Sequence, residues 1–361
     1  MERLRFAARD PGGANVLAAW ARTHPLPHAL TADAWTMERA TPRFEGLGLP
    51  VRQFDSSGLD ALRAAWAADP ATILVTGTSH YEPFESVLWE IAREAGVPSL
   101  ALLDTWGNVA ARFTRSRPDA VGALDASQVA ELLDGGFELK QILLAGHPWL
   151  REMKAKRPAA APAGRTNEVR VLFVSEAIAS DVASGFNRPF GFDEFDAFAL
   201  VHAAAGDAAR GGCAVDLQIR LHPYEDPAAF AVRLREVSHE PGVRVAIADS
   251  SQPPHVQVEQ ADLVCGMTSI LLIEAMVLGR PVISVQPGLL RENTFEPAVR
   301  GWTDTLVDPG AARARCAELM TDPNARRELL LRHQGMADGL CGDSTAVEDW
   351  LRANSRAWSA A

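Results

Sequence analysis

The sequence predicts two α/β domains, each built on a doubly wound parallel sheet. The chain has 361 residues, which is the usual length of two domains. Short apolar strands alternate with helices through both halves, and this alternation is typical of parallel sheets. A segment rich in Pro and Ala, residues 158–166, interrupts the alternation near the midpoint and predicts a linker.

The first half contains five expected strands and four expected helices. The strands are expected at residues 4–8, 72–76, 99–103, 119–123 and 141–145. The helices are expected at residues 16–22, 59–68, 85–95 and 126–134. The helix at 85–95 is the best delimited, because Gly96 and Pro98 follow it and end it.

The second half repeats the same alternation. Strands are expected at residues 169–174, 215–221, 243–247, 262–265 and 282–285. Helices are expected at residues 195–206, 228–237, 271–278, 311–321, 326–335 and 345–353, and we expect a frayed tail after Asn354. The predicted division is an N-terminal domain over 1–157, a linker over 158–168, a C-terminal domain over 169–340, and a helix and tail over 341–361.

Composition and charge exclude several classes of protein. A net charge of −11 argues against a broad nucleic-acid surface. No window approaches 18 uninterrupted apolar residues, so we expect no transmembrane segment, and the N-terminus does not resemble a signal peptide. The four cysteines are scattered, which indicates reduced thiols in a cytoplasmic protein, with peripheral docking at the inner membrane face left open. We expect no metal, because the chain has neither a DxD triplet nor an HxxxH motif.

The most informative segment is residues 261–288, which predict a strand, a helix and a second strand. Four residues form the turn between the first strand and the helix: Gly266, Met267, Thr268 and Ser269. A helix N-terminus preceded by glycine offers free N–H groups to a phosphate. Glu274 lies five residues after Ser269, within reach of a ribose but poorly placed for a phosphate.

A second candidate for phosphate binding ends the strand at 215–221. Arg220 and His222 point the same way, because side chains alternate along a strand, and Pro223 fixes the backbone after the histidine. A guanidinium beside an imidazole can hold a phosphate or a diphosphate. The alternative is an ordinary surface histidine at a strand end.

The first domain must supply any general base and acceptor site. Asp10 ends the first strand, where a base would face a ligand, and three residues of the following turn let backbone approach that ligand: Gly12, Gly13 and Asn15. The alternative is a helix N-cap with a tight turn. His80 follows the strand at 72–76 together with Thr78 and Ser79, and its ordinary pKa suits a base.

Further candidates follow other strands. Asp104 could be the base and Trp106 could stack on a sugar face, although a single tryptophan is more often buried beneath a loop. Ser175 and Glu176 follow the first strand of the second domain, where they could face phosphates or an acceptor, or merely cap the next segment. The aromatic loop at 187–192 is either a lid or a connection that packs on the core.

Nearly the whole chain resembles the glycosyltransferase superfamily with two Rossmann-like domains, the GT-B architecture. Three segments carry the resemblance. Residues 143–150 look like the strand, turn and short helix that end the first domain of this group. Residues 220–223 are similar to the His-Pro motif of bacterial sialyltransferases, polysialyltransferases and polyglycerol-phosphate transferases, in which the histidine meets the donor phosphate. Residues 266–288 look like the donor-binding cassette, which places its ribose-binding glutamate on Glu274.

The resemblance implies a bacterial, metal-independent glycosyltransferase whose two domains face each other across a cleft. The donor would be a nucleotide sugar, and the acceptor a sugar, a lipid-linked or a small-molecule hydroxyl, for example in polysaccharide or glycoconjugate biosynthesis. Nucleotide-sugar 2-epimerases and hydrolases share the architecture, and either activity is an alternative, as is a non-catalytic protein that binds a nucleotide or a partner. The chain departs from two patterns: it lacks the acidic Asp/Glu-Asp-Gly motif of polysialyltransferases, and residues 291–297 only loosely echo the Thr-Glu-Arg-Pro-Glu run of the epimerases.

Overall fold

The structure, a computed structural model, contains two compact units, which are considered separately. It describes residues 2–37, 39–55, 59–79, 83–107, 109–157, 167–185, 188–237 and 239–359. Unit 1 comprises Met1–Glu152 and Asp338–Ala361, and unit 2 comprises Met153–Ala337. The unit boundaries fall within α5 (Pro148–Ala155) and α13 (Pro323–Cys341). The predicted linker lies mostly outside the described residues; Glu168, its last residue, begins β8.

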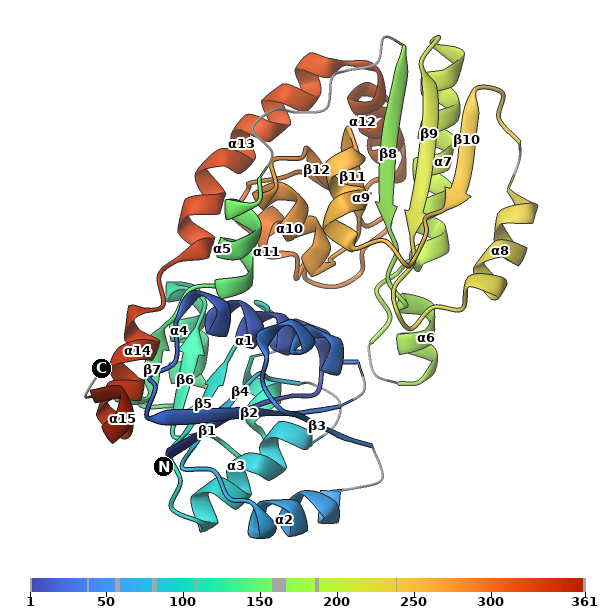
Figure 1. Ribbon diagram of the computed structural model, residues 1–361. Helices are drawn as coiled ribbons and strands as arrows, with labels where there is room; N and C mark the ends of the chain where they lie inside the picture. Colours follow the sequence, from blue (N-terminus) through green and yellow to red (C-terminus); the bar gives the residue numbers. More distant parts are fainter. Residues whose placement is uncertain are drawn as a thin grey trace. The chain divides into compact units, whose positions relative to one another are not determined.

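Unit 1 is built on a seven-stranded sheet in the order β3-β2-β1-β4-β5-β6-β7 (Figure 1). The strands, all paired in parallel, are β1 (Glu2–Ala8), β2 (Leu30–Met37), β3 (Val51–Phe54), β4 (Ile73–Thr76), β5 (Ser99–Leu102), β6 (Ala120–Ala123) and β7 (Ile142–Leu144). The helices include α1 (Pro11–Thr23), α2 (Leu59–Ala68), α3 (Phe84–Glu94) and α4 (Ala126–Asp134), with short 3-10 turns such as η3 (Ala110–Phe113). The central strands β4, β5 and β6 are buried along their whole length, in agreement with their mainly apolar sequences.

Unit 2 has a six-stranded parallel sheet in the order β10-β9-β8-β11-β12-β13. Its strands are β8 (Glu168–Val174), β9 (Ala214–Arg220), β10 (Val243–Ile247), β11 (Leu263–Gly266), β12 (Val282–Val285) and β13 (Thr305–Leu306). Its helices are α6 (Ile178–Ala183), α7 (Glu194–Arg210), α8 (Pro227–Glu236), α9 (Pro254–Gln260), α10 (Ile270–Val277), α11 (Glu296–Val299) and α12 (Pro309–Thr321). The long α7 begins at a capping box on Asp193 and packs against α12 (Figure 1).

The strand order places a topological switch point in each sheet. In unit 1 the chain moves outward from β1 in one direction to β2 and in the other to β4. In unit 2 the same reversal separates β8 from β11. Open α/β sheets bind ligands outside the carboxyl ends of the strands at such points. The candidate site residues should therefore be sought in the loops that follow β1 and β4, and β8 and β11.

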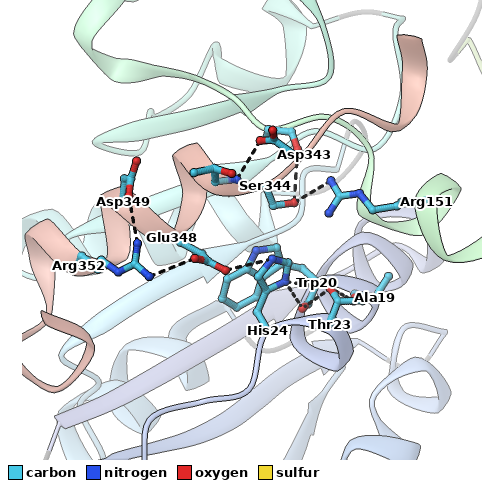
Figure 2. A network of polar contacts seen from close by, with 12 residues as sticks. Ala19, Trp20, Thr23, His24, Arg151, Asp343, Ser344, Glu348, Asp349 and Arg352 are labelled. Carbon is cyan, nitrogen blue, oxygen red and sulfur yellow. Dashed lines mark hydrogen bonds and ion pairs between the residues drawn. The ribbon is translucent and has the colours of Figure 1, made fainter. Parts of the chain in front are cut away.

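The C-terminal segment belongs to unit 1. α14 (Thr345–Asn354) lies beside α1: His24 stacks on Trp20 with ring centres 4.8 Å apart, and its Nε2 lies 3.3 Å from a Glu348 carboxylate oxygen (Figure 2). The residues after Asn354 form the short helix α15 (Arg356–Ser359) rather than the frayed tail that we expected. Trp358 explains the difference, because this side chain is 5 % exposed and packs against Trp20.

Candidate functional site

The loops after β1 and β4 meet closely at the switch point of unit 1. Gly13, in the first turn of α1, faces Gly77, the first residue after β4. A Cβ atom on Gly77 would lie 2.7 Å from the Cα of Gly13, so only glycine permits this approach. Two predicted site residues, Gly12 and Gly13, therefore belong to the first turn of α1, and Asn15 lies in the next turn.

A buried ion pair lies beside this contact. Arg112, on η3, donates through Nη1 to Asp104 Oδ1 at 2.8 Å and to the Thr78 hydroxyl at 2.6 Å. Thr78 Oγ1 lies 3.3 Å from the same Asp104 oxygen, to which it donates. The side chains of Arg112 and Asp104 are only 8 % and 13 % exposed. Asp104 also reaches α1, because a Cβ on Gly12 would overlap its Oδ2. The predicted residues Thr78 and Asp104 thus lie together.

Two more carboxylates complete the cluster of unit 1. Asp10 is the N-cap residue of α1, but its side chain makes no capping hydrogen bond and instead pairs with Arg9 Nη1 at 2.5 Å. Burial raises the pKa of Asp10, opposed by the Arg9 charge and reinforced by the negative charge of Asp104. Glu85, on α3, accepts hydrogen bonds from Ser79 Oγ at 2.5 Å and from the Arg9 N–H at 2.8 Å.

Glu85 is the most deeply buried carboxylate of this cluster. Its residue is 1 % exposed, and this burial raises its pKa to about 7 in spite of the two hydrogen bonds it accepts. The nearby charge of Asp10 raises the pKa further. Asp10, Glu85 and Asp104 therefore gather at the carboxyl ends of neighbouring strands, interleaved with Arg9 and Arg112. We call these five residues the acidic cluster.

His80 and Trp106 are two further predicted residues of the first domain. His80 lies outside the described residues. Trp106 is 5 % exposed, and its Nε1 donates to Asp125 Oδ2 at 2.7 Å. Asp125 is the N-cap residue of α4, so the indole ties two loops together, as expected for the buried alternative. The ring packs within unit 1 rather than presenting a face to solvent.

A carboxylate occupies the turn of unit 2 that the sequence assigns to a phosphate. Glu176, just after β8, accepts from the Thr268 N–H at 2.6 Å, from the Thr268 hydroxyl at 2.7 Å and from the Ser269 N–H at 3.0 Å. Burial raises the pKa of Glu176, although these hydrogen bonds oppose the rise. Ser269 acts as the N-cap residue of α10 and accepts from the Leu271 N–H at 3.2 Å.

The remaining members of the predicted cassette lie inside unit 2. A Cβ on Gly266 would lie 2.7 Å from the carbonyl oxygen of Val174, so glycine allows β11 to approach β8 closely. Met267 is fully buried. Glu274, on α10, is 7 % exposed, so little of this residue faces solvent.

The side chains of the predicted pair, Arg220 and His222, form hydrogen bonds with neighbouring segments of unit 2. Arg220 Nη1 donates to the carbonyl oxygen of Gln252 at 2.9 Å and to Gln257 Oε1 at 3.2 Å, which anchors the segment before α9. His222 Nδ1 accepts from the Tyr224 N–H at 3.3 Å. Pro223 is exposed between them. β9 ends at Arg220, so His222 lies beyond the strand, and alternation along a strand does not set its direction relative to Arg220. The direction of the Arg220 guanidinium depends on a loop that carries no sequence pattern.

Glu225 links the His-Pro segment to β8. Its carboxylate accepts from the Ser175 hydroxyl at 2.7 Å and from the His222 N–H at 2.5 Å. Burial raises the pKa of Glu225 to about 7, and the charges of Glu194 and Glu176 add to the rise. Ser175, a predicted loop residue, thus makes a hydrogen bond within unit 2.

Sequence reasoning missed several of these residues. Arg9 and Glu85 carry no motif, although Arg9 directly precedes the predicted Asp10. Arg112 follows Asp104 by eight positions, a spacing with no periodic meaning, and only the turn of η3 returns it to the carboxylate. Glu225 lies three residues after His222, and this closeness in sequence is the feature that could have pointed to it.

The described residues contain neither a cluster suited to a metal ion nor a helix suited to a membrane. Within the described part of the chain, no group of three or more His, Cys, Asp or Glu residues is arranged to hold a metal ion. Among the same residues, none of the helices has the length and apolar character needed to span a bilayer.

Solved structures share this fold over nearly the whole chain. S. aureus MnaA, solved with UDP, has a TM-score of 0.68 and 12% identity, covering 98% of this chain and 95% of that one. A putative UDP-N-acetylglucosamine 2-epimerase from Listeria monocytogenes has a TM-score of 0.66 and 12% identity, covering 98% and 96%. The glycotransferase of kitacinnamycin has a TM-score of 0.61 and 16% identity, covering 98% of both chains. The chain has the two-domain Rossmann-like fold of GT-B proteins. The predicted fold class is thereby confirmed.

These likenesses extend to the fold alone. No protein-family model and no curated protein matches the chain. None of the three structures quoted is a sialyltransferase, so the similarity of the His-Pro segment to that group stays a prediction.

Proposed function

We propose that the chain is an enzyme that acts on a nucleotide sugar, and that its reaction is epimerisation next to the anomeric carbon. The observation that carries the proposal is the acidic cluster of unit 1. It gathers Asp10, Glu85 and Asp104 at a topological switch point, where α/β folds bind their ligands. The names of two similar structures, a protein solved with UDP and a UDP-N-acetylglucosamine 2-epimerase, support a uridine nucleotide sugar as substrate.

The chemistry of epimerisation needs more than one acid-base group. Inverting a carbon centre requires removal of a proton from one face and its return to the opposite face. Burial raises the pKa values of both Asp10 and Glu85, and that of Glu85, about 7, suits proton transfer near neutral pH. Arg9 and Arg112 place positive charge in the same cluster, where it would stabilise negative charge that develops on the substrate.

The second candidate is transfer of the sugar to an acceptor hydroxyl. A single base, Asp10 or Asp104, would suffice for this reaction. The similarity to the glycotransferase of kitacinnamycin over 98% of both chains favours keeping it. Both reactions are proposed to proceed without a metal ion, because the arginines supply the positive charge.

The test is incubation of the protein with UDP-N-acetylglucosamine in D₂O containing EDTA, followed by proton NMR. Epimerisation predicts a second sugar-nucleotide species with deuterium at the inverted carbon, in the absence of any acceptor. UDP release that depends on an added acceptor would instead establish the transferase, and release without an acceptor would establish a hydrolase. Binding of UDP without turnover would point to the non-catalytic alternative.

A matched pair of variants ties the activity to the acidic cluster. Asp10→Asn should lower turnover about 100-fold or more, the range expected for loss of an acid-base group. Asp60→Asn, an exposed carboxylate on α2, should leave turnover unchanged. If calorimetry detects neither UDP nor the nucleotide sugar, the nucleotide-sugar proposal is wrong.

A further inference from the structure

Two loops at the carboxyl edge of the unit 2 sheet are joined by a backbone hydrogen bond and a close packing contact. The first runs from Arg188 to Phe192, immediately before α7, and the second follows β12. The Leu290 N–H donates to the carbonyl oxygen of Phe190 at 2.8 Å. Gly191 has a φ of +99°, and a Cβ on it would lie 2.7 Å from Leu290 Cγ. The contact is therefore close enough to require glycine.

Each loop carries one arginine, and the two guanidinium groups influence each other. The Arg291 guanidinium carbon lies 3.9 Å from the centre of the Phe190 ring, which is a cation–π contact. Phe190 is only 7 % exposed, so the ring that the guanidinium contacts is held by its packing. Arg188 lies two residues before Phe190, and Arg291 lies over the ring of Phe190, so the hydrogen bond between the loops brings both arginines to one place. Burial lowers the pKa of Arg291, and the positive charge of Arg188 lowers it further.

The surroundings of the two arginines matter because the chain as a whole is acidic. The sequence has 46 Asp and Glu residues against 35 Lys and Arg residues. The neighbouring Arg300 pairs with Glu296, and Arg315 pairs with Asp304. Among the residues that the structure describes, neither Arg188 nor Arg291 forms an ion pair or a side-chain hydrogen bond. Two neighbouring positive charges without a counter-charge are the arrangement expected of an anion site.

The two arginines lie at the carboxyl ends of the strands, where open α/β sheets bind their ligands. Arg291 follows the carboxyl end of β12, and Arg188 precedes the N-terminus of α7, which begins at that same edge. The two groups first expected to bind phosphate are already engaged. Arg220 holds the segment before α9, and the Thr268 and Ser269 N–H groups are taken by Glu176.

We propose that Arg188 and Arg291 form the phosphate-binding pair of unit 2. A guanidinium is planar and its N–H groups can bind two phosphate oxygens at once; the contact with the Phe190 ring limits the motion of Arg291, so binding costs less side-chain entropy. The inference deepens the proposed function, on which it rests for the nucleotide, and assigns the diphosphate of the substrate to these two residues. The same chemistry would bind a phospholipid headgroup, and Leu290, 81 % exposed between them, would then enter the membrane.

The experiment measures binding of UDP, uridine and pyrophosphate by calorimetry at two salt concentrations. Arg291→Ala should weaken UDP and pyrophosphate binding tenfold or more, Arg188→Ala should weaken both by less, and uridine binding should not change. Arg291→Lys should fall between wild type and Arg291→Ala, because charge remains but the planar fork is lost. The matched control is Arg233→Ala. Arg233 also makes a cation–π contact, with its guanidinium carbon 4.5 Å from the centre of the Phe195 ring, but it lies on α8 and outside the two loops. This variant should bind UDP and pyrophosphate like wild type. Melting temperatures verify folding.

The outcomes separate this inference from the proposed function. Unchanged UDP affinity in the double variant Arg188→Ala/Arg291→Ala would overturn the inference and leave the proposed function standing. Pyrophosphate binding that is lost in Arg291→Ala, in a protein that does not bind UDP, would keep the anion site and remove the nucleotide. Binding to phosphatidylglycerol vesicles but to neither UDP nor pyrophosphate, lost in Arg291→Ala, would assign the pair to a lipid headgroup. A wild-type protein that binds none of these would overturn both proposals.

Discussion

Glu176 and Thr268 are joined twice: one carboxylate oxygen accepts the Thr268 N–H at 2.6 Å, and the other accepts the Thr268 hydroxyl at 2.7 Å. The first oxygen also accepts the Ser269 N–H at 3.0 Å. The N–H groups of the turn before α10 are therefore already bound to a carboxylate, which the loop after β8 supplies. A phosphate that used the same N–H groups would first have to displace this carboxylate.

Replacing Glu176 distinguishes a structural carboxylate from a competitor of the ligand. Glu176→Gln turns one acceptor oxygen into an N–H₂ group that faces donors, so it should lower the free energy of unfolding by about 1–3 kcal/mol, the cost of an unsatisfied buried polar group. UDP affinity should stay the same, because the phosphates are assigned to Arg188 and Arg291. Urea unfolding and calorimetry measure the two quantities, with Glu236→Gln on the exposed end of α8 as the control. Tighter UDP binding by Glu176→Gln would show that the carboxylate and the phosphate compete for the turn.

Breaking the Arg112–Asp104 pair from one side should be a costly single change in unit 1, because it leaves a buried charge without its partner. Arg112→Met leaves the Asp104 carboxylate buried without its partner, and breaking a buried pair in this way costs about 3–5 kcal/mol. Arg63→Met removes an arginine from an exposed pair with Glu94 and should cause no resolvable change. Urea midpoints of both variants test the contrast. Equal shifts in the two variants would mean that the pair in the acidic cluster is no more important than a surface contact.

The sequence predicted the buried strands better than it predicted which side chains meet at their carboxyl ends. The apolar runs of β4, β5, β11 and β12 are buried along their length, so their pattern was unambiguous. The edge strand β3 and its neighbour β2 were not predicted. β2 mixes exposed, partly buried and buried positions without strict alternation, so its strand form is set by pairing with β1.

The partners of the charged residues could not be predicted for a different reason. Arg5 meets Asp33 because β1 pairs with β2 in the register that sets these two residues side by side. Arg112 reaches Asp104 through the turn of η3, and no helix or strand period encodes either separation. Arg220 was placed correctly on β9, but its hydrogen bonds go to a loop more than thirty residues away. Helix and strand periods order neighbours in the chain, whereas ion pairs depend on tertiary packing.

The raised pKa of Glu85 makes the stability of the protein depend on pH. A carboxyl group with a pKa of about 7 when folded, against an ordinary value of 4.5, keeps its proton in the folded state over a range where the unfolded chain has released it. Stability should therefore fall as pH rises from about 4.5 to about 7, by on the order of 3 kcal/mol for this one group.

Glu85→Gln should remove that share of the pH dependence, because the amide does not titrate. Relative to wild type, the variant should be more stable at pH 8 than at pH 5.5. Glu94→Gln, an exposed carboxylate on the same helix, should follow the wild-type profile. Urea midpoints across this range give the comparison. Parallel profiles for wild type and Glu85→Gln would rule out Glu85 as the titrating group.

The approach of Gly77 to Gly13 gives the last prediction, because it links packing to the acidic cluster. A Cβ on residue 77 would lie 2.7 Å from the Cα of Gly13, a contact that only a backbone shift can relieve. Gly77→Ala should therefore lower the free energy of unfolding by about 1–3 kcal/mol, the range found for overpacked interiors. It should also lower turnover, since the first turn of α1 would move relative to Thr78 and Asp104. Gly46→Ala is the matched control, because a Cβ there meets nothing within 4 Å. Full turnover in a destabilised Gly77→Ala protein would show that the position of this turn does not matter to the reaction.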